Sequence, residues 1–245
     1  MLDCWTETFP LGFTAIDRSD RLTLSGAFDY FQSAAIQHAE LLGVGRQVMA
    51  ETGQVWILSR MSVMIENRPK YRELITVRSW SHGWERLFAL REYDMRDSGH
   101  TLLVRGVSAW LIMDRARGRP ARPQGIVEPL PRNENRDAFP GGPAELKPKE
   151  GLRKTGERRA FYSDIDFNGH VNNARYIQWI QDAADPALLE QADRLRLDIN
   201  YLSETKPGDL TEFWTAPLDQ SCFAVEGRRS ESGQPVFRAE LRFFC

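Results

Sequence analysis

The sequence predicts an α+β fold built from two similar halves, in each of which an antiparallel β-sheet follows a long helix. Each half opens with one stretch of helical periodicity and continues with segments rich in β-branched and aromatic residues. Turn residues separate these segments, as expected between consecutive antiparallel strands. Helices and strands do not alternate, which argues against a doubly wound fold. Because both halves repeat one order of elements, an internal duplication is the simplest explanation.

The first helix is predicted over residues 25–43. Ser25 can cap its N-terminus, and apolar side chains recur at helical spacing until Gly43 and Gly45 end the run. Four strands are expected after it, at residues 55–65, 74–81, 85–95 and 102–113, with a hairpin turn at Asp97-Ser98-Gly99. The first half is therefore expected to pack one long helix on an antiparallel meander.

A basic, proline-rich segment, residues 114–159, separates the halves. Prolines disfavour regular structure, so we predict a linker that crosses the surface. Its basic excess, in a chain of net charge −2, predicts one positively charged face. The expected division is an N-terminal domain at residues 1–125, a linker at 126–157 and a C-terminal domain at 158–245.

The second half repeats the order of the first. Its helix is predicted to begin with Asn172 or Asn173 as the cap and to end before Pro186. Strands are expected at residues 195–202, 210–217, 222–228 and 236–244, with a turn at residues 230–233.

Composition excludes several classes of protein. With 42% hydrophobic and 27% charged residues, the 245-residue chain is typical of a soluble globular protein, and its near-neutral charge argues against nucleic-acid binding. No apolar run is long enough to span a membrane, and the acidic N-terminus predicts no signal peptide. Cys4, Cys222 and Cys245 lack disulfide or zinc spacing, and the four histidines form no HxxH or HExxH pair. We therefore expect a cytoplasmic protein without a metal or other cofactor.

Three polar residues lie at alternate positions just before the second helix: Asp166, Asn168 and His170. In extended backbone all three would point to one side, near a helix N-terminus that favours negative charge. Gly169 permits tight backbone geometry between them. Such a group can hold an imidazole beside a developing oxyanion. The alternative is a purely structural cap, with His170 as one more satisfied polar side chain.

The string Asp-Phe-Asn-Gly-His-Val-Asn-Asn-Ala-Arg-Tyr-Ile-Gln-Trp, residues 166–179, resembles the D-x-N-x-H-V-N-N-x-x-Y-x-x-W signature of acyl-acyl-carrier-protein thioesterases. Residues 37–39, 56–61 and 80–81 are similar to the N-terminal segment of that family. The resemblance implies a tandem double hot-dog fold, each half an antiparallel sheet wrapped around a long helix. It also implies a partner, an acyl carrier protein with a fatty acyl chain, whose acidic face the basic linker would receive.

A second segment, residues 200–209, is similar to the family's Y-x-x-E-C-G-x-D motif, and the resemblance makes Glu204 catalytic. Here Thr205 follows in place of cysteine, so we expect direct attack by water with Glu204 as the base. Asn168 and His170 would position water or carbonyl, oriented by Asp166, and helix-start amides near Asn172 and Asn173 would stabilise the oxyanion. A Ser or Thr acyl-enzyme stays open, as does a structural role for Glu204 beside Lys206.

The duplication allows an internal comparison. Placing Asp17 over Asp166 sets Ser19 opposite Asn168 and Arg21 opposite His170, so only the second half carries the complete group. The first half is then free to bind the acyl chain. Its candidate lining residues, which could equally be plain core, are Phe28, Phe31, Trp56 and Met61.

Four functions are weighed. The preferred one is hydrolysis of acyl-acyl-carrier protein to free fatty acid. An acyl-coenzyme A thioesterase with the same site is the close alternative, and a hot-dog hydratase or a non-catalytic acyl-binding protein is less favoured, because the Asp166, Asn168, His170 and Glu204 set is complete. Acyl chain length, and whether two chains form a homodimer, stay open.

Overall fold

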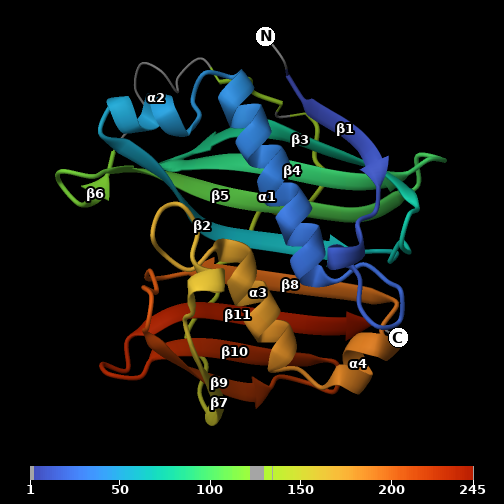
Figure 1. Cartoon of the computed structure of the whole chain (residues 1–245), viewed down its shortest axis with the longest axis vertical. Helices are drawn as coiled ribbons and strands as arrows, with labels where there is room; N and C mark the ends of the chain where they lie inside the picture. The colour runs from blue at the N-terminus through green and yellow to red at the C-terminus, as the bar shows by residue number, and fades with distance from the viewer. Residues whose placement is uncertain (1–2, 122–129, 134, 245) are drawn as a thin grey trace.

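The computed structural model describes residues 3–121, 130–133 and 135–244, in which eleven strands form one antiparallel sheet. The strands run in the order β1-β3-β4-β5-β2-β8-β11-β10-β9-β7, with β6 paired to β5. Figure 1 shows the two long helices, α1 and α3, on the same face of this sheet.

The elements of the first half are β1 (Trp5–Pro10), η1 (Phe13–Ala15), α1 (Leu24–Leu41), α2 (Arg46–Glu51), β2 (Gln54–Ile65), β3 (Leu74–Glu85), β4 (Phe88–Asp97), β5 (Leu102–Asp114) and β6 (Arg119–Pro120). Those of the second half are β7 (Arg153–Arg159), η3 (Tyr162–Asp164), α3 (Asn173–Asp182), α4 (Pro186–Gln191), β8 (Arg194–Tyr201), β9 (Leu210–Pro217), β10 (Cys222–Arg229) and β11 (Pro235–Phe244). Both halves therefore contain a long helix and an antiparallel meander, as the sequence predicts, and each half also has an edge strand that was not predicted.

The halves join through their central strands. β2 pairs antiparallel with β8, with Ser62 opposite Asp198, and the buried Ser62 hydroxyl donates to the Asp198 carboxylate. This pairing makes the sheet continuous within one chain.

The helix boundaries follow from their caps. Thr23, not Ser25 as expected, caps α1, because its hydroxyl accepts a 3.0 Å hydrogen bond from the Gly26 N–H. Gly43, with φ +72°, follows the end of α1 in the left-handed conformation that glycine tolerates. Asn172 caps α3, as predicted, and accepts from the Ala174 N–H at 2.8 Å.

Buried apolar side chains from both helices meet one shared core. Phe31 of α1 is fully buried and stacks on Tyr93 of β4, with ring centroids 4.9 Å apart. Trp179 and Ile180 of α3 are equally buried. Burying side chains of this size contributes about 1.5–3 kcal/mol each, so the core fixes both helices on the sheet.

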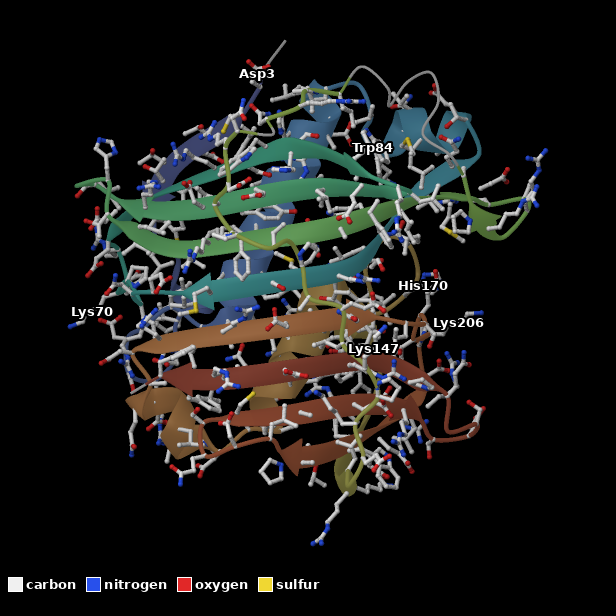
Figure 2. All side chains as sticks on the ribbon, turned by 180° about the vertical axis from the view of Figure 1, so that it is seen from behind. Asp3, Lys70, Trp84, Lys147, His170 and Lys206 are labelled. Atoms are coloured by element: carbon white, nitrogen blue, oxygen red, sulfur yellow. The ribbon has the colours of Figure 1, made fainter. Side chains whose placement is uncertain are left out.

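The linker prediction is wrong at its C-terminal end, because β7 lies inside the segment predicted to lack regular structure. β7 is an edge strand that pairs only with β9 and is exposed and highly charged, so it lacks the alternation that reveals strands. Figure 2 shows the rest of the linker crossing the outer face of the sheet. There the Leu146 N–H donates to the Asn200 side chain at 2.8 Å. Residues 126–129 and 134 of the predicted linker lie outside the described residues.

The remaining differences are short elements. β1, α2 and α4 were not predicted, since each spans only six residues. Among the described helices, none is both long and apolar enough to cross a membrane.

Candidate active site

A closed turn precedes α3 and carries the three polar residues singled out from the sequence. Ile165 and Val171 form an isolated bridge, and between them the Asp166 N–H donates to the His170 carbonyl at 2.9 Å. Gly169 adopts φ +80°, which few other residues tolerate. The extended row considered from the sequence is therefore wrong, and the backbone doubles back between Asp166 and His170.

Asp166 organises this turn. Its Oδ1 accepts from the Asn168 N–H at 2.8 Å and its Oδ2 accepts from the Asn168 side-chain amide at 3.4 Å. The carboxylate thus fixes both the backbone and the side chain of Asn168. The Asn168 side-chain oxygen receives no hydrogen bond from the described residues and is free to orient a ligand or a water.

Glu204 returns to the turn from the end of β8. Its Oε2 lies 3.0 Å from His170 Nε2, so the two side chains are in contact although they lie far apart in the sequence. The side chain of His170 is 29% exposed and that of Glu204 is 54% exposed, so water reaches both. Figure 2 shows His170 at the side of the molecule, level with the border between the two halves of the sheet.

Two contacts hold the Glu204 backbone in place. The Val171 N–H donates to the Thr205 carbonyl at 2.9 Å. Arg229, at the end of β10, donates to the Glu204 carbonyl at 2.7 Å and to Asp209 at 2.9 Å. Arg229 was not singled out from the sequence, because nothing in its local pattern distinguishes it from other arginines at strand ends.

Thr205 occupies the position at which the resembling family carries cysteine. It is only 1% exposed, and its hydroxyl, which lies near the Tyr176 phenol, makes no hydrogen bond of good geometry within the described residues. A hydroxyl enclosed in this way cannot attack a substrate carbonyl without a change of conformation. Nearby, burial together with the Glu204 charge raises the pKa of Tyr176 to about 12, so that phenol stays protonated.

The start of α3 gives different roles to its two asparagines. The side chain of Asn172 is occupied as the cap. The backbone N–H of Asn173, the first residue of the helix, bonds to none of the described residues, and Asn173 borders a pocket. A free N–H at a helix N-terminus is suited to stabilise negative charge.

This pocket has a volume of about 170 Å³ and lies mainly in the first half, between α1, α2 and strands β2, β4 and β5. Asp166, Phe167, Asn168 and Asn173 border it on the side of the turn. Its apolar wall comprises Ala35, Ile36, Ala39, Val44, Met49, Val55, Trp56, Ala89, Leu90, Trp110 and Leu130.

The expected lining residues divide into two groups. Trp56 borders the pocket, whereas Phe28, Phe31 and Met61 are buried in the main core and do not border it. Arg46 of α2 lies over the Phe167 ring, 4.0 Å from its centroid, and so links the first half to the turn.

One group of described side chains could supply metal ligands, and it lies away from this turn. His82 of β3, Glu92 of β4 and Asp137 offer ligand atoms that all lie within 4.8 Å of one another. Glu92 also accepts from the backbone N–H groups of Ala138 and Phe139, so this group holds the linker against the outer face of the sheet. The candidate active site itself contains carboxylate, amide and imidazole groups and no such cluster among the described residues.

Known proteins with similar sequences are thioesterases. The chain is 26% identical over 221 residues to palmitoyl-acyl carrier protein thioesterase of Arabidopsis thaliana, covering 82% of this chain and 51% of that protein. It is 23% identical to oleoyl-acyl carrier protein thioesterase 2 of the same plant, covering 79% and 57%. The chain thus spans about half the length of the curated relatives it matches.

Solved structures agree over the whole chain. An acyl-ACP thioesterase from Bacteroides thetaiotaomicron superposes with a TM-score of 0.89 at 26% identity, covering 99% of this chain and 98% of that one. The 12:0-ACP thioesterase from Umbellularia californica gives 0.84 at 19% identity, covering 98% and 97%. These likenesses confirm the predicted double hot-dog fold.

Two family descriptions match nearly the entire chain. The acyl-ACP thioesterase N-terminal domain matches residues 3–129, and the acyl-ACP thioesterase C-terminal domain matches residues 150–241. The chain therefore belongs to the acyl-ACP thioesterase family.

Proposed function

We propose that the protein hydrolyses the thioester of a fatty acyl-acyl carrier protein to free fatty acid and holo-carrier protein. The observation that supports this most directly is the contact between His170 and Glu204 at a turn whose Asp166 and Asn168 border an apolar pocket. An apolar pocket with a few convergent polar groups at one end suits a long apolar chain with a reactive carbonyl at its end. The names of the relatives point to the same substrate class.

In the proposed mechanism, water attacks the thioester carbonyl and Glu204 accepts the proton that the water loses. The 3.0 Å contact between His170 Nε2 and Glu204 Oε2 orients the carboxylate and leaves Oε1 to accept this proton. Asn168, held by Asp166, positions the water or the carbonyl. The Asn173 N–H stabilises the tetrahedral oxyanion. Collapse breaks the carbon–sulfur bond, and the proton on Glu204 passes to the leaving thiolate.

The cysteines support attack by water over a cysteine acyl-enzyme. Cys4 lies beside β1, at the far edge of the sheet from β8, and Cys222 is buried at the start of β10, at the opposite end of that strand from Arg229. Cys245 lies outside the described residues. Thr205, the remaining candidate nucleophile, is enclosed.

The proposed mechanism gives the two halves different roles. We assign the acyl chain to the N-terminal domain (residues 1–125), because the pocket lies mainly between its elements, and the reacting groups to the C-terminal domain (residues 158–245). The basic linker is the proposed contact for the acidic carrier protein, through a charge attraction that acts mainly on the association rate.

The proposed location is the cytoplasm, where unpaired cysteines are normal. The β2–β8 pairing completes the sheet within one chain, so the sheet itself does not require a homodimer.

The test is a steady-state assay of thiol release, with acyl-carrier protein and acyl-coenzyme A of the same chain lengths measured side by side. We expect a higher kcat/KM for the carrier-protein substrate, and we expect added salt to reduce that advantage. Equal or better turnover of acyl-coenzyme A would replace the proposal by its alternative. Binding without turnover of either substrate would indicate a non-catalytic acyl-binding protein.

A further inference from the structure

The pocket wall contains a buried cation. Arg91 of β4 borders the pocket, and the residue is only 9% exposed. Its Nη1 donates to the Ser79 hydroxyl at 2.9 Å and lies 2.9 Å from His38 Nδ1. Nε and Nη2 have no hydrogen-bond partner among the described residues, and none of the described carboxylates forms an ion pair with this guanidinium.

Arginines at comparable or more exposed positions have counterions. Arg68, with a side chain 3% exposed, pairs with Asp17, and Arg78 pairs with Asp94. Burying a charge without an opposite charge is costly, and burial lowers the pKa of Arg91 for this reason. An uncompensated guanidinium on a pocket wall is therefore a feature that a ligand could complete.

The position of Arg91 defines which part of a ligand it would meet. Glu204 follows β8, and the sheet order β8-β2-β5-β4 places Arg91 three strands away. At the usual separation of neighbouring strands this is roughly 14 Å along the sheet. A thioester beside the turn would thus extend its acyl chain across β2 and β5 toward Arg91.

We propose that Arg91 is a carboxylate-binding subsite, so that the substrates include acyl carriers whose chain bears a second carboxylate far from the thioester. This inference rests on the proposed thioesterase function. A carboxylate is the acyl-chain group that both neutralises a guanidinium and matches its planar pair of donors, and Nε and Nη2 form such a pair. Ala35, Leu90 and Trp110 also border the pocket and limit the water that would weaken this contact.

A keto or hydroxyl group on the chain would use the same donors without neutralising the charge. A carboxylate adds the attraction between opposite charges to the hydrogen bonds, so oxygenated chains without a carboxylate are expected to gain less.

The experiment compares matched acyl-carrier-protein substrates of eight to sixteen carbons that end in either a methyl group or a carboxylate. We expect kcat/KM for the wild type to favour the carboxylate end by at least about tenfold at the best length. Arg91→Met should abolish this preference while the variant still hydrolyses methyl-ended chains. Arg96→Met is the matched control, since Arg96 lies on the same strand, pairs with Asp94 and does not border the pocket, and it should keep the preference.

A binding measurement on the wild type keeps the test independent of how Arg91→Met folds. Trp56 and Trp110 border the pocket, so tryptophan fluorescence can follow ligand binding. The monomethyl ester of a dicarboxylic acid should bind at least about tenfold more tightly than the methyl ester of a monocarboxylic acid of equal length. Equal affinities, or a substrate preference that Arg91→Met leaves unchanged, would overturn the subsite. If only methyl-ended chains are hydrolysed, the subsite is overturned and the proposed function stands. If no acyl-acyl-carrier protein is hydrolysed, the proposed function itself is contradicted.

Discussion

The two halves contain the same turn before their long helices, and only one of the two turns is open to a ligand. In the first half Ile16 bridges Leu22, and in the second Ile165 bridges Val171, at the same offset in the sequence. The Ser19 N–H donates to Asp17 Oδ1 at 2.8 Å, as the Asn168 N–H does to Asp166 Oδ1. The alignment of Asp17 with Asp166 predicted from the sequence is thereby confirmed.

The side chains at equivalent positions differ in chemistry. Arg21 occupies the position equivalent to His170. The Leu22 N–H donates to the Pro69 carbonyl, as the Val171 N–H donates to the Thr205 carbonyl. Arg68 therefore occupies the position equivalent to Glu204. Arg68 pairs with Asp17 and donates to the Leu22 and Leu189 carbonyls, each at 2.8 Å.

α4 covers the first turn and leaves the second free. Arg18 pairs with Glu190 of α4, and Arg21 donates to the Glu190 carbonyl and pairs with Asp193. Figure 1 shows α4 on the opposite side of the molecule from the turn that precedes α3. The same turn is thus covered and has a structural role in the first half, whereas in the second half it is an open polar site.

The largest expected effect is that of Glu204→Gln, which keeps shape and hydrogen bonding but removes the base. Turnover should fall by about 10²–10⁴ while KM changes little, because the lost interaction acts only in the transition state. Steady-state assays of the hydrolysis of acyl-acyl-carrier protein measure both turnover and KM. Glu231→Gln, on an exposed turn, is the control and should be fully active. A fully active Glu204→Gln enzyme would show that Glu204 is only a strand-end charge.

Arg68→Met, at the position equivalent to Glu204, should show the opposite pattern. It leaves Asp17 and two backbone carbonyls without their donor, so we expect a loss of about 3–5 kcal/mol in the free energy of unfolding. Denaturant unfolding gives that value, and kcat per folded molecule should stay near that of the wild type. A stable but inactive Arg68→Met protein would mean that the first turn also takes part in catalysis.

His170→Ala should lower turnover at least about a hundredfold with the melting temperature retained, since His170 orients the carboxylate that accepts the proton. Arg21→Ala is the matched change in the first half. It removes contacts with Glu190 and Asp193 and should cost about 1 kcal/mol of stability without changing turnover. Normal turnover by a folded His170→Ala enzyme would make His170 structural, like its counterpart.

Much of this architecture could be predicted because it follows from hydrophobic periodicity. β9 spans the predicted residues 210–217, and α3 begins after one of the two predicted caps. The exposed edge strand β7 could not be found in this way, because a strand with no buried face carries no alternation.

The candidate site was predictable only in part. Its residues came from motif spacing and family resemblance, and the structure brings His170 and Glu204 together. The closed turn, the Arg229 contacts and the position of Arg91 could not be predicted, because each depends on which strands become neighbours in the sheet.

Trp56 and Met61 allow a comparison within the first half, because Trp56 borders the pocket and Met61 lies in the main core. Trp56→Ala enlarges the pocket, so it should shift the preferred acyl chain toward longer substrates, by about 1–3 kcal/mol in discrimination. Met61→Ala removes a core side chain instead and should lower stability by about 2–5 kcal/mol with the chain-length profile unchanged. Profiles of kcat/KM against chain length, with unfolding curves, separate the two. An altered profile in Met61→Ala, or none in Trp56→Ala, would place the acyl chain elsewhere.

The smallest effect should come from Thr205→Val, which replaces the hydroxyl by a methyl group of similar size. Because the buried hydroxyl makes no hydrogen bond of good geometry among the described residues, its loss removes an unsatisfied polar group, and stability should stay the same or rise by about 1 kcal/mol. If water attacks directly, turnover should stay within about twofold of the wild type. Mass spectrometry of the acid-quenched reaction provides the second readout and should find no acyl group on any residue. An acyl group trapped on Thr205, together with an inactive Thr205→Val enzyme, would replace the Glu204 base mechanism by a covalent one. The hydroxyl would then have to leave its enclosed position during turnover, and Glu204 would deprotonate it instead of water.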